Sequence, residues 1–444
     1  MKIIKYTFVL ALVVSFTSCK RWIETDASVT NPNAGVGATS EIILRHMMVA
    51  AIQANEGNNA RYANMFTQHF RGLARQHAGY DSYIMNSQNF QWGLEYQQII
   101  HQGKLVIEMS QSNRHQQGVT KIIQAWTFGN LTSLYGNIPF TEADQFETIK
   151  EPKFDDQMTV VYPGIQALLD EAIADLEATG NIEGDIYLGG DAAKWIAVAN
   201  TLKARYYLHV KDYANALTAA NKGISATGND VVATHNGTTQ SGRNLWNDFL
   251  ALQRTTDYGA TGSFLEAFIK TGGAKNNAKT NESARYADIF AINDDGNLDI
   301  NFFGTSSLFS PTSSFPLITY RENMLIMAEA NARLGNDAAA LTALNSVRQS
   351  LAAQYTTGTY TDYVAADFAT NADLITEVVR ERYVTLVGQI EVFNDLRRTQ
   401  NAIGITPATG TTLPGRFLYP NAEAQSNTNT PTGVTLFDVL PVFQ

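Results

Sequence analysis

A single cysteine near the amino terminus constrains this chain more than any other feature. Residues 1–19 read MKIIKYTFVLALVVSFTSC, with Lys2 and Lys5 ahead of an apolar run at residues 8–14 and Cys19 at the end. A short positive segment followed by an apolar run too short to cross a bilayer is the layout of a secretory signal peptide. Because Cys19 is the only cysteine, an exported chain of this sequence has no internal disulfide, and packing alone must hold its fold.

The position of Cys19 resembles the lipobox of a bacterial lipoprotein, with residues 16–18 (FTS) directly before it. In this interpretation residues 1–18 are removed, and the thiol of Cys19 is acylated and begins the mature chain. The alternatives are a spare thiol in a discarded signal and a short N-terminal transmembrane anchor. Residues 19–40 are polar, rich in Asn, Ser, Thr and Gly, and lack periodicity, so we expect a lipidated tether there.

Charge and composition exclude several classes of function. The chain has 32 basic and 42 acidic residues, and residues 1–18 hold two of the lysines and no acid, which leaves a formal charge of about −12 on the mature chain. Such a charge argues against a nucleic-acid partner and against direct adhesion to anionic lipid. The sequence contains no HExxH, GxSxG, phosphate-binding glycine loop or GxGxxG, and its seven histidines lack ligand spacing. We therefore predict no cofactor, no metal and no catalytic residues.

Apolar residues at helical spacing predict an all-α fold. The clearest helix covers residues 161–176, and Asp191 is expected to cap another. Short amphipathic helices joined by tight turns at 191–217 and at 320–350, the latter broken at Gly335, are similar to tetratricopeptide-type pairs. The prediction is a tetratricopeptide-like helical repeat scaffold with a large irregular, loop-rich portion.

Two stretches lack this periodicity, and they define our division of the chain. Residues 56–92 are dense in aromatic and amide side chains, and residues 228–315 are rich in Gly, Asn, Thr and Ser. Long irregular segments in compact proteins are usually functional. We divide the chain into residues 1–18 (signal peptide), 19–40 (lipidated tether), 41–227 (N-terminal helical part with the insertion 56–92), 228–315 (irregular ligand-binding part) and 316–444 (C-terminal helices and closing loops).

Five segments in order resemble the SusD/RagB family of nutrient-binding outer-membrane lipoproteins of Bacteroidota. They are the lipobox at Cys19, LTSLYGNIPFTEA (131–143), PLITYRENMLIMAEANARLG (316–335), ITEVVRERYVTLVGQIEVFNDLRRT (375–399) and GRFLYPNAEAQSN (415–427). The resemblance covers essentially the whole mature chain. One departure is Lys20-Arg21-Trp22, which replaces the acidic run associated with surface export in this phylum.

The resemblance implies a fold, a partner and a ligand class. The scaffold would contain four tetratricopeptide-like helix pairs and an irregular part that carries the ligand site. The partner would be a SusC-like TonB-dependent β-barrel transporter, which the lipid-anchored protein covers as a lid at the outer membrane, with the anchor placing it on the cell surface. The ligand would be a glycan or, in some members, a peptide. Two alternatives are a surface glycan hydrolase on the same scaffold, because two carboxylates brought together by a fold suffice for hydrolysis, and a structural adhesin.

Candidate ligand-binding residues come from the two irregular stretches, where aromatic rings stand beside amide and charged groups. Flat aromatic faces stack on sugar rings, and the polar neighbours bond the hydroxyls. The candidates are Tyr80, Asp81, Tyr83, Asn86, Asn89, Phe90 and Trp92 from the first stretch, and Trp246, Arg254 and Tyr258 as an opposing wall.

Other prominent residues have structural interpretations. We expect Glu329, Asp395, Arg397 and Arg398 to make caps and buried ion pairs, and Tyr135, Gly136 and Pro139 to set a turn. The run 293–299 (NDDGNLD) does not fit an EF-hand, because Ala291 and Phe302 would occupy its first and twelfth positions. A solvated Asp-Gly turn is favoured there, with a looser calcium loop as the alternative.

Overall fold

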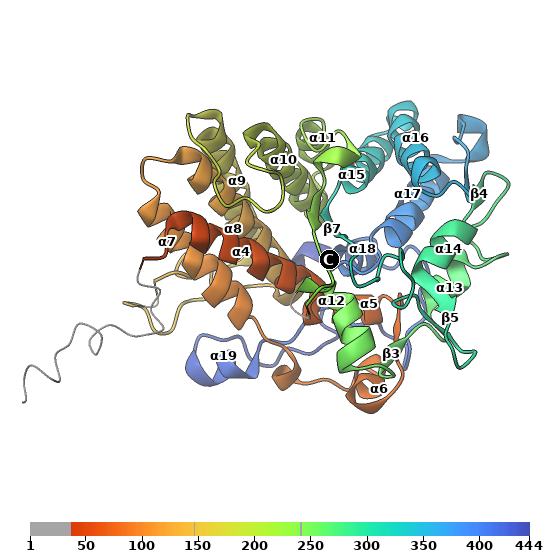
Figure 1. The fold of residues 1–444 in the computed structure, drawn as a ribbon, viewed down its shortest axis with the longest axis horizontal. Helices are drawn as coiled ribbons and strands as arrows, with labels where there is room; N and C mark the ends of the chain where they lie inside the picture. Colours follow the sequence, from red (N-terminus) through yellow and green to blue (C-terminus); the bar gives the residue numbers. More distant parts are fainter. Residues whose placement is uncertain (1–36, 146, 240–241) are drawn as a thin grey trace, which may run out of the picture.

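The computed structural model describes residues 37–145, 147–239 and 242–444; the predicted signal peptide, Cys19 and the tether up to residue 36 lie outside this part of the chain. Helices dominate, which confirms the all-α prediction. The longer α-helices are α4 (Ser40–Glu56), α8 (Arg114–Tyr135), α9 (Tyr162–Glu177), α10 (Ala192–His209), α15 (Tyr320–Arg333), α16 (Asp337–Gln354) and α17 (Asn371–Thr385) (Figure 1).

Shorter helices fill the intervals. The α-helices among them are α5 (Asn58–Phe66), α6 (Arg75–Asp81), α7 (His101–Met109), α11 (Tyr213–Ala220), α12 (Leu245–Asp248), α13 (Phe264–Ile269), α14 (Ser283–Ile289), α18 (Glu391–Arg398) and α19 (Asn421–Ser426). Wider π-helical turns form η2 (Leu94–Ile100), η3 (Gln157–Val161) and η6 (Phe249–Gln253), and 3₁₀ turns form η1 (Ser87–Asn89), η4 (Thr227–Asn229), η7 (Ala365–Asp367) and η8 (Pro441–Phe443).

The strands are two to four residues long and pair only in twos within the described residues. The antiparallel pairs are β1 (Arg71–Gly72) with β3 (Tyr258–Gly259), β2 (Val231–Ala233) with β7 (Phe315–Ile318), β4 (Thr280–Asn281) with β8 (Thr359–Tyr360), and β5 (Phe290–Ile292) with β6 (Leu298–Ile300). Each ladder therefore pins an irregular segment to another part of the chain and does not form a core of its own.

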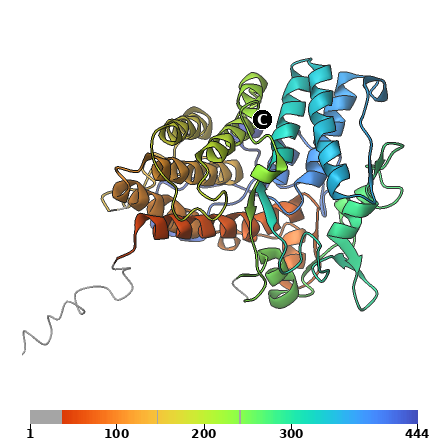
Figure 2. The same cartoon turned by 45° about the horizontal axis from the view of Figure 1, so that its top comes forward.

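Helix hairpins stack side by side to build the scaffold. Helix α8 packs on α9, α10 on α11, and α15 on α16, while the contacts of α9 with α10 and of α11 with α15 join the hairpins into one row. Figure 2 shows this row along the upper side, with the irregular segment that carries α12–α14 below it at the right. The tetratricopeptide-like prediction is thereby confirmed as an architecture.

Local sequence signals explain where these helices begin, end and meet. The carboxylate of Asp191 accepts from the backbone N–H groups of Ala193 and Lys194, so it caps α10 as predicted. Helix α8 ends at Tyr135 because Gly136 adopts a φ of 88°, which favours glycine. Within α8, a Cβ atom on Gly129 would lie 2.1 Å from the ring of Tyr206, so only glycine allows α10 to approach this closely.

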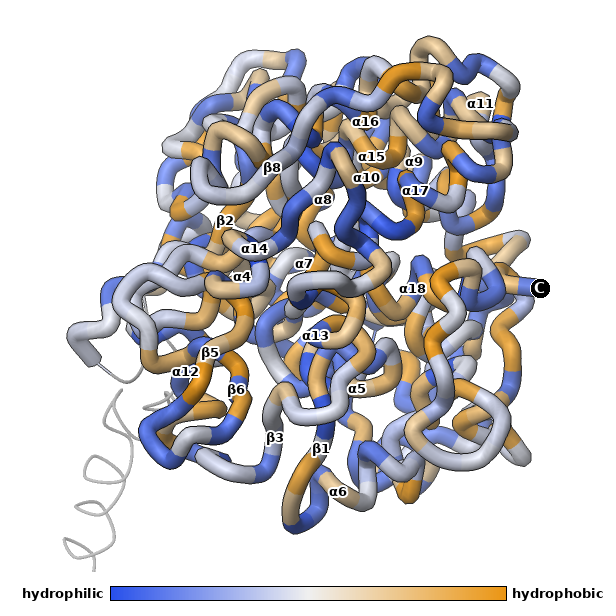
Figure 3. Tube along the Cα trace, turned by 90° about the vertical axis from the view of Figure 1, so that its right-hand side faces the viewer, coloured by the Kyte–Doolittle hydropathy of each residue, from blue (hydrophilic) through white to orange (hydrophobic). Residues whose placement is uncertain are grey.

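The two irregular stretches contain more helix than their composition suggested. Residues 56–92 hold α5, α6 and η1, and residues 228–315 hold α12, α13 and α14. These helices are three to nine residues long, so their periodicity is too brief to detect from sequence. The run 293–297 forms the turn between β5 and β6, where the side chain of Asn293 accepts from the N–H groups of Asp295 and Asn297. In Figure 3 these two strands are hydrophobic and the turn is hydrophilic.

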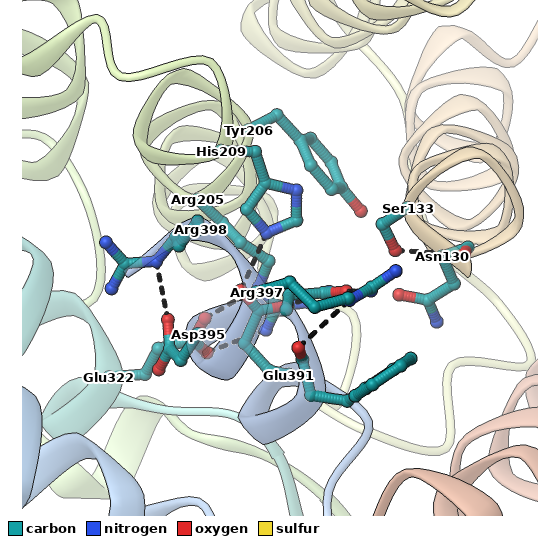
Figure 4. Close-up of polar contacts among 12 residues, drawn as sticks. Asn130, Ser133, Arg205, Tyr206, His209, Glu322, Glu391, Asp395, Arg397 and Arg398 are labelled. Carbon is teal, nitrogen blue, oxygen red and sulfur yellow. Dashed lines mark hydrogen bonds and ion pairs between the residues drawn. The ribbon is translucent and has the colours of Figure 1, made fainter. Parts of the chain in front are cut away.

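Buried ion pairs and a histidine–carboxylate hydrogen bond join the helices to one another. Arg205 on α10 meets Glu322 on α15 at 2.6 Å, and His209 on α10 meets Glu391 on α18 at 2.7 Å (Figure 4). A second chain of contacts runs from Arg382 to Asp395, from Asp395 to Arg398, and from Arg398 to Glu329, each at 2.7 Å. The predicted ion-pair roles of Glu329, Asp395 and Arg398 are confirmed. The guanidinium of Arg397 instead donates to backbone carbonyls of Phe393 and Gly415 and lies 3.9 Å from the ring of Phe393.

The chain beyond residue 36, apart from residues 146, 240 and 241, contains no helix that is long and apolar enough to cross a membrane.

The Glu329 carboxylate provides a test of the ion-pair network. Burial alone would raise the pKa of Glu329, but the charge and hydrogen bonds of Arg398 outweigh it and lower the pKa to about 2. Its contribution to stability is therefore present above the ordinary carboxylate pKa near 4.5 and is lost as the pH falls toward 2. We expect Glu329→Gln to reduce the free energy of unfolding at pH 7 by about 3–5 kcal/mol, because it leaves Arg398 partly uncompensated.

Chemical denaturation at pH 7 and pH 3 measures this effect, and Glu171→Gln is the control. Glu171 is 63% exposed and pairs with Lys121 at the surface, so the control is expected to change stability by less than about 1 kcal/mol. Equal effects of the two substitutions would show that the buried network does not hold the helices together.

Candidate functional site

Three hollows lie in sequence across one side of the molecule. The Trp92 hollow, of about 420 Å³, shares Gln91 and Gly93 with the Arg61 hollow, of about 310 Å³. The Arg61 hollow in turn shares Gln253 with the Arg254 hollow, also of about 310 Å³. We call the three together the binding groove. It runs from α19 past α12 to α6, elements that lie in the lower half of Figure 1.

Residues of the π-helix η2 line two of the three hollows. The helix begins at Leu94, directly after Gly93, which both hollows share. Glu95 of this helix lines the Arg61 hollow, and the next residue, Tyr96, lines the Trp92 hollow. The wider turn of a π-helix alters the directions of successive side chains, and such turns are frequent at functional sites. Here adjacent residues of one helical turn serve two different hollows.

Aromatic and proline side chains form the Trp92 hollow. Trp92 is 6% exposed and packs edge-on against Tyr96 and Tyr135, with ring centres 5.3 and 5.0 Å away. The hydroxyl of Tyr96 donates to the carbonyl oxygen of Pro139 at 2.8 Å, and this contact holds its ring in place. Pro152 and Pro420 complete an apolar wall, and the carboxylate of Glu423 supplies a polar group.

The Arg61 hollow is polar and contains a cation without a carboxylate partner. Arg61 on α5 donates to Oδ1 of Asn58 at 2.6 Å, and its guanidinium lies 4.2 Å from the ring centre of Phe249. In the described part of the chain no carboxylate oxygen lies within 4 Å of it. Burial lowers the pKa of Arg61 to about 10, so it remains charged at pH 7.

Two carboxylates face the same hollow. Glu95 accepts from the side-chain amide of Asn59 at 3.0 Å, and its burial raises the pKa of Glu95 to about 7. Asp248 has one oxygen, Oδ1, that is buried without a hydrogen-bond partner. An unsatisfied buried acceptor is costly unless a ligand or water donates to it. The hollow therefore offers both donors and acceptors to a polar ligand.

Basic side chains surround a single carboxylate in the Arg254 hollow. The side chain of Asp257 is 1% exposed and meets Nε of Arg75 at 2.5 Å and Nδ1 of His77 at 3.1 Å, while Nε of Arg254 lies 3.9 Å away. The side chains of Arg75 and Arg254 are 62% and 48% exposed. Burial lowers the pKa of His77 despite the neighbouring carboxylate. Two arginines thus reach solvent over one acid, which makes this end of the groove positive.

Three of the predicted ligand-binding residues line the groove. Asn89 belongs to the Arg61 hollow, Trp92 to the Trp92 hollow and Arg254 to the Arg254 hollow. The amide of Asn89 donates to the hydroxyl of Tyr80, and its Oδ1 accepts from the N–H of Asn86. Tyr80 and Asn86 therefore hold Asn89 in place from outside the groove.

The remaining predicted residues occupy structural positions. Tyr83, Phe90, Trp246 and Tyr258 are each at most 7% exposed, pack in the main hydrophobic core and line none of the three hollows. Trp92 belongs to the same core but also lines a hollow. The hydroxyl of Tyr83 accepts from the N–H of Ala408, and the hydroxyl of Tyr258 donates to the carbonyl oxygen of Arg61. Asp81 pairs with Arg71 at 2.6 Å.

Sequence reasoning missed the polar centre of the groove. Asn58, Asn59, Arg61, Glu95 and Gln253 line the Arg61 hollow, and none of them was among the predicted ligand-binding residues. The one available signal was the break at Gly57 followed by two adjacent asparagines, which marks the end of α4 and the start of α5. Within the described ranges no group of three or more His, Cys, Asp or Glu side chains is arranged to hold a metal ion.

Comparison with known proteins gives one family and a set of similar folds. Residues 32–420 match the model of the SusD-like family, described as starch-binding and associating with the outer membrane. A SusD/RagB family protein of Bacteroides thetaiotaomicron is 20% identical, with a TM-score of 0.66 over 88% of this chain and 95% of its own. No curated protein matches the sequence significantly.

Two further solved structures have the same fold. A SusD homolog of Bacteroides fragilis is 16% identical, with a TM-score of 0.71 over 92% of this chain and 99% of its own. A chitin-binding SusD homolog of Flavobacterium johnsoniae is 13% identical, with a TM-score of 0.68 over 90% of this chain and 98% of its own. At these identities the likeness is one of fold.

The raised pKa of Glu95 gives a prediction for stability. Because the folded chain holds this proton up to about pH 7 while an unfolded carboxyl releases it near pH 4.5, stability falls as the pH rises between these values. We expect Glu95→Gln to stabilise the fold at pH 8 by up to about 3 kcal/mol and to have little effect at pH 4. Denaturant unfolding at both pH values measures this, and a destabilisation at pH 8 would contradict it.

Proposed function

Because the chain belongs to the SusD-like family of binding proteins that associate with the outer membrane, we propose that it is a lipid-anchored nutrient-binding protein. It captures an oligosaccharide, or alternatively a peptide, and passes it to a partner SusC-like TonB-dependent transporter. The observation that carries this proposal is the binding groove, in which an aromatic hollow, an amide-rich hollow and a basic hollow follow one another.

The order of the hollows suits an extended ligand with several similar units. An aromatic and proline wall packs on the apolar face of one sugar ring, while Asn58, Asn59 and Arg61 in the next hollow bond hydroxyl groups of its neighbour. No covalent step is required of these residues. A few hydrogen bonds and one ring contact give moderate affinity, which suits a protein that must release its ligand to a transporter.

The anchor determines where this binding takes place. Acylation of Cys19 would hold the domain on a tether at the outer membrane, within reach of a β-barrel partner, and the absence of acidic residues at positions 20–22 bears on whether it faces the cell surface. Protease treatment of intact cells tests the orientation: cleavage of the domain supports exposure on the cell surface, and protection contradicts it.

A surface hydrolase is the alternative that one observation favours. Glu95 and Asp248 line the same hollow, and the raised pKa of Glu95 would suit a general acid. Incubation of the purified chain with oligosaccharides separates the two functions, because any catalysed hydrolysis that Glu95→Gln abolishes would replace the binding-only proposal.

The groove can be blocked at its centre without strain. Gly93 lines two hollows, has a φ of −62° and has only the side chain of Gln97 near its Cβ position, at 3.9 Å. We expect Gly93→Leu to fold normally and to weaken ligand binding at least about tenfold, because the new side chain occupies the groove. Calorimetry of the chain carrying Cys19→Ser against a panel of glycans and peptides measures this.

Gly79→Leu is the matched control. Gly79 lies in α6, has open space around its Cβ position and lines none of the three hollows. Full affinity of the Gly93→Leu variant for a ligand that the parent chain binds would move the site away from the groove.

Removal of the thiol tests the anchor. We expect Cys19→Ser to shift the protein from the membrane fraction to the soluble fraction. Without an acyl chain on residue 19, the polar tether alone provides no stable attachment to the membrane. Cell fractionation measures the shift, and co-purification of a β-barrel with the parent chain tests the proposed partner. Undiminished membrane attachment of the variant would favour the N-terminal transmembrane anchor instead.

A further inference from the structure

A separate cavity of about 460 Å³ lies between the helical scaffold and the irregular part. We call it the Arg321 cavity, and its polar lining includes Asp230, Arg285, Thr319, Arg321, Ser350 and Tyr355. It shares no lining residue with the binding groove. Helices α15, α16 and α17, which contribute to it, lie at the upper right of Figure 1, and strand β7, which also contributes, lies nearer the centre.

Arg321 enters this cavity without a counter-ion. Its Nε donates to Oγ of Ser350 at 2.8 Å and its Nη2 to the carbonyl oxygen of Ser350 at 2.9 Å. No carboxylate within the described ranges approaches its guanidinium to 4 Å, and no protein atom there accepts from Nη1. Burial lowers the pKa of Arg321 from its ordinary value. A half-buried cation in this state lacks the compensation that charges removed from water normally have.

The neighbouring Arg285 makes the contrast clear. It lines the same cavity, but its donors face Glu282 at 2.6 Å and Glu381 at 2.7 Å. Its charge is therefore compensated within the protein, whereas the charge of Arg321 is open to a ligand.

The free donors of Arg321 have a defined geometry. A guanidinium carries five N–H bonds in one plane, and Ser350 takes the Nε donor and one Nη2 donor. What remains is the edge made by Nη1 and the second Nη2 hydrogen. Two parallel N–H bonds on one edge match the two oxygens of a carboxylate.

The rest of the lining sets the size and character of a ligand. Oδ1 of Asp230 accepts from the N–H of Tyr320 at 2.6 Å, while its Oδ2 has no partner in the described part of the protein. The hydroxyl of Tyr355 donates to Asp288, which leaves its oxygen free to accept. Pro316, Leu351 and Val387 provide apolar surface. The volume suits one or two sugar or amino-acid residues.

We propose that the Arg321 cavity is a second ligand site that binds the carboxylate of a small molecule through the Nη1–Nη2 edge of Arg321. Two sources share this chemistry, a uronic acid sugar and a short peptide. They differ at Asp230, because the ammonium group of a peptide would pair with its free oxygen, whereas the hydroxyl groups of a uronic acid do not depend on a charged acceptor.

Calorimetry of the full chain carrying Cys19→Ser tests the site with glucuronate, alanylalanine and glucose at pH 7.5. We expect saturable binding of glucuronate or of alanylalanine, and no binding of glucose at the same concentrations. Arg321→Gln is expected to weaken the binding about tenfold or more, and Arg321→Lys to restore little of it, because lysine keeps the charge but loses the two-donor edge. Arg45→Gln, at an exposed position outside the cavity, is expected to have no effect.

A second pair of variants avoids any loss of the Ser350 contacts. Ala353 is exposed and lines the cavity, while its exposed neighbour Ala352 does not. We expect Ala353→Glu to repel the carboxylate and weaken binding several-fold, and Ala352→Glu to leave it unchanged. Absence of binding by both carboxylate probes, or binding that neither Arg321→Gln nor Ala353→Glu weakens, would overturn the proposal.

Asp230→Asn distinguishes a peptide ligand from a uronic acid ligand. A loss of alanylalanine binding of about tenfold supports the peptide form of the proposal, because the ammonium group loses its partner. Unchanged or tighter binding of glucuronate supports the uronic acid form. Loss of glucuronate binding in this variant would contradict the proposed contact with Arg321, since removal of a negative charge should not weaken a carboxylate bound there.

Discussion

Pairing of charges away from water is the constraint on which this structure depends. Arg205 and Glu322 join α10 to α15, and Arg398 on α18 pairs with Glu329 on α15 and with Asp395 on its own helix, all with side chains at most 4% exposed. Two helices in apolar contact can shift along one another at little cost in free energy. A buried ion pair between them is strongly destabilising when its partners separate. The network therefore fixes the register of helices whose facing surfaces are otherwise small and apolar, and it does so in a chain without a disulfide.

The same reasoning shows why fold and site differ in how far sequence could predict them. Periodic apolar residues predicted α9 and α10, Asp191 predicted the start of α10, and Gly136 predicted the end of α8. These signals could be recognised because the cap signals act within one helical turn and the periodicity lies within one continuous segment. Whether an aromatic residue is core or ligand wall depends on what packs over it. Trp246 is fully buried against Phe70 and Tyr258, while Trp92 reaches a hollow, and no local pattern separates them.

Arginine burial carries information that sequence alone does not. Arg285 faces a carboxylate from a distant part of the chain and Arg382 faces one from the next helix. Among the described residues, no carboxylate lies within 4 Å of Arg61 or Arg321, although carboxylates line both of their cavities. Each unpaired guanidinium is tied down by neutral groups, Asn58 in one case and Ser350 in the other, which fix its position without cancelling its charge. At the proposed sites, a cation held in this way would already be in position when a ligand arrives, which lowers the entropy lost on binding.

The overall charge of the chain limits what these cations can do. With 42 acidic against 32 basic residues, the distant field of the protein repels anions, and salt screens that field beyond about 10 Å. Arg61 and Arg321 therefore contribute through short contacts inside cavities and do not steer ligands from afar. It follows that an acidic ligand would be recognised by geometry after entry, with an affinity that depends weakly on ionic strength. The exposed Arg75 and Arg254, by contrast, would contribute an electrostatic attraction to ligands that added salt weakens.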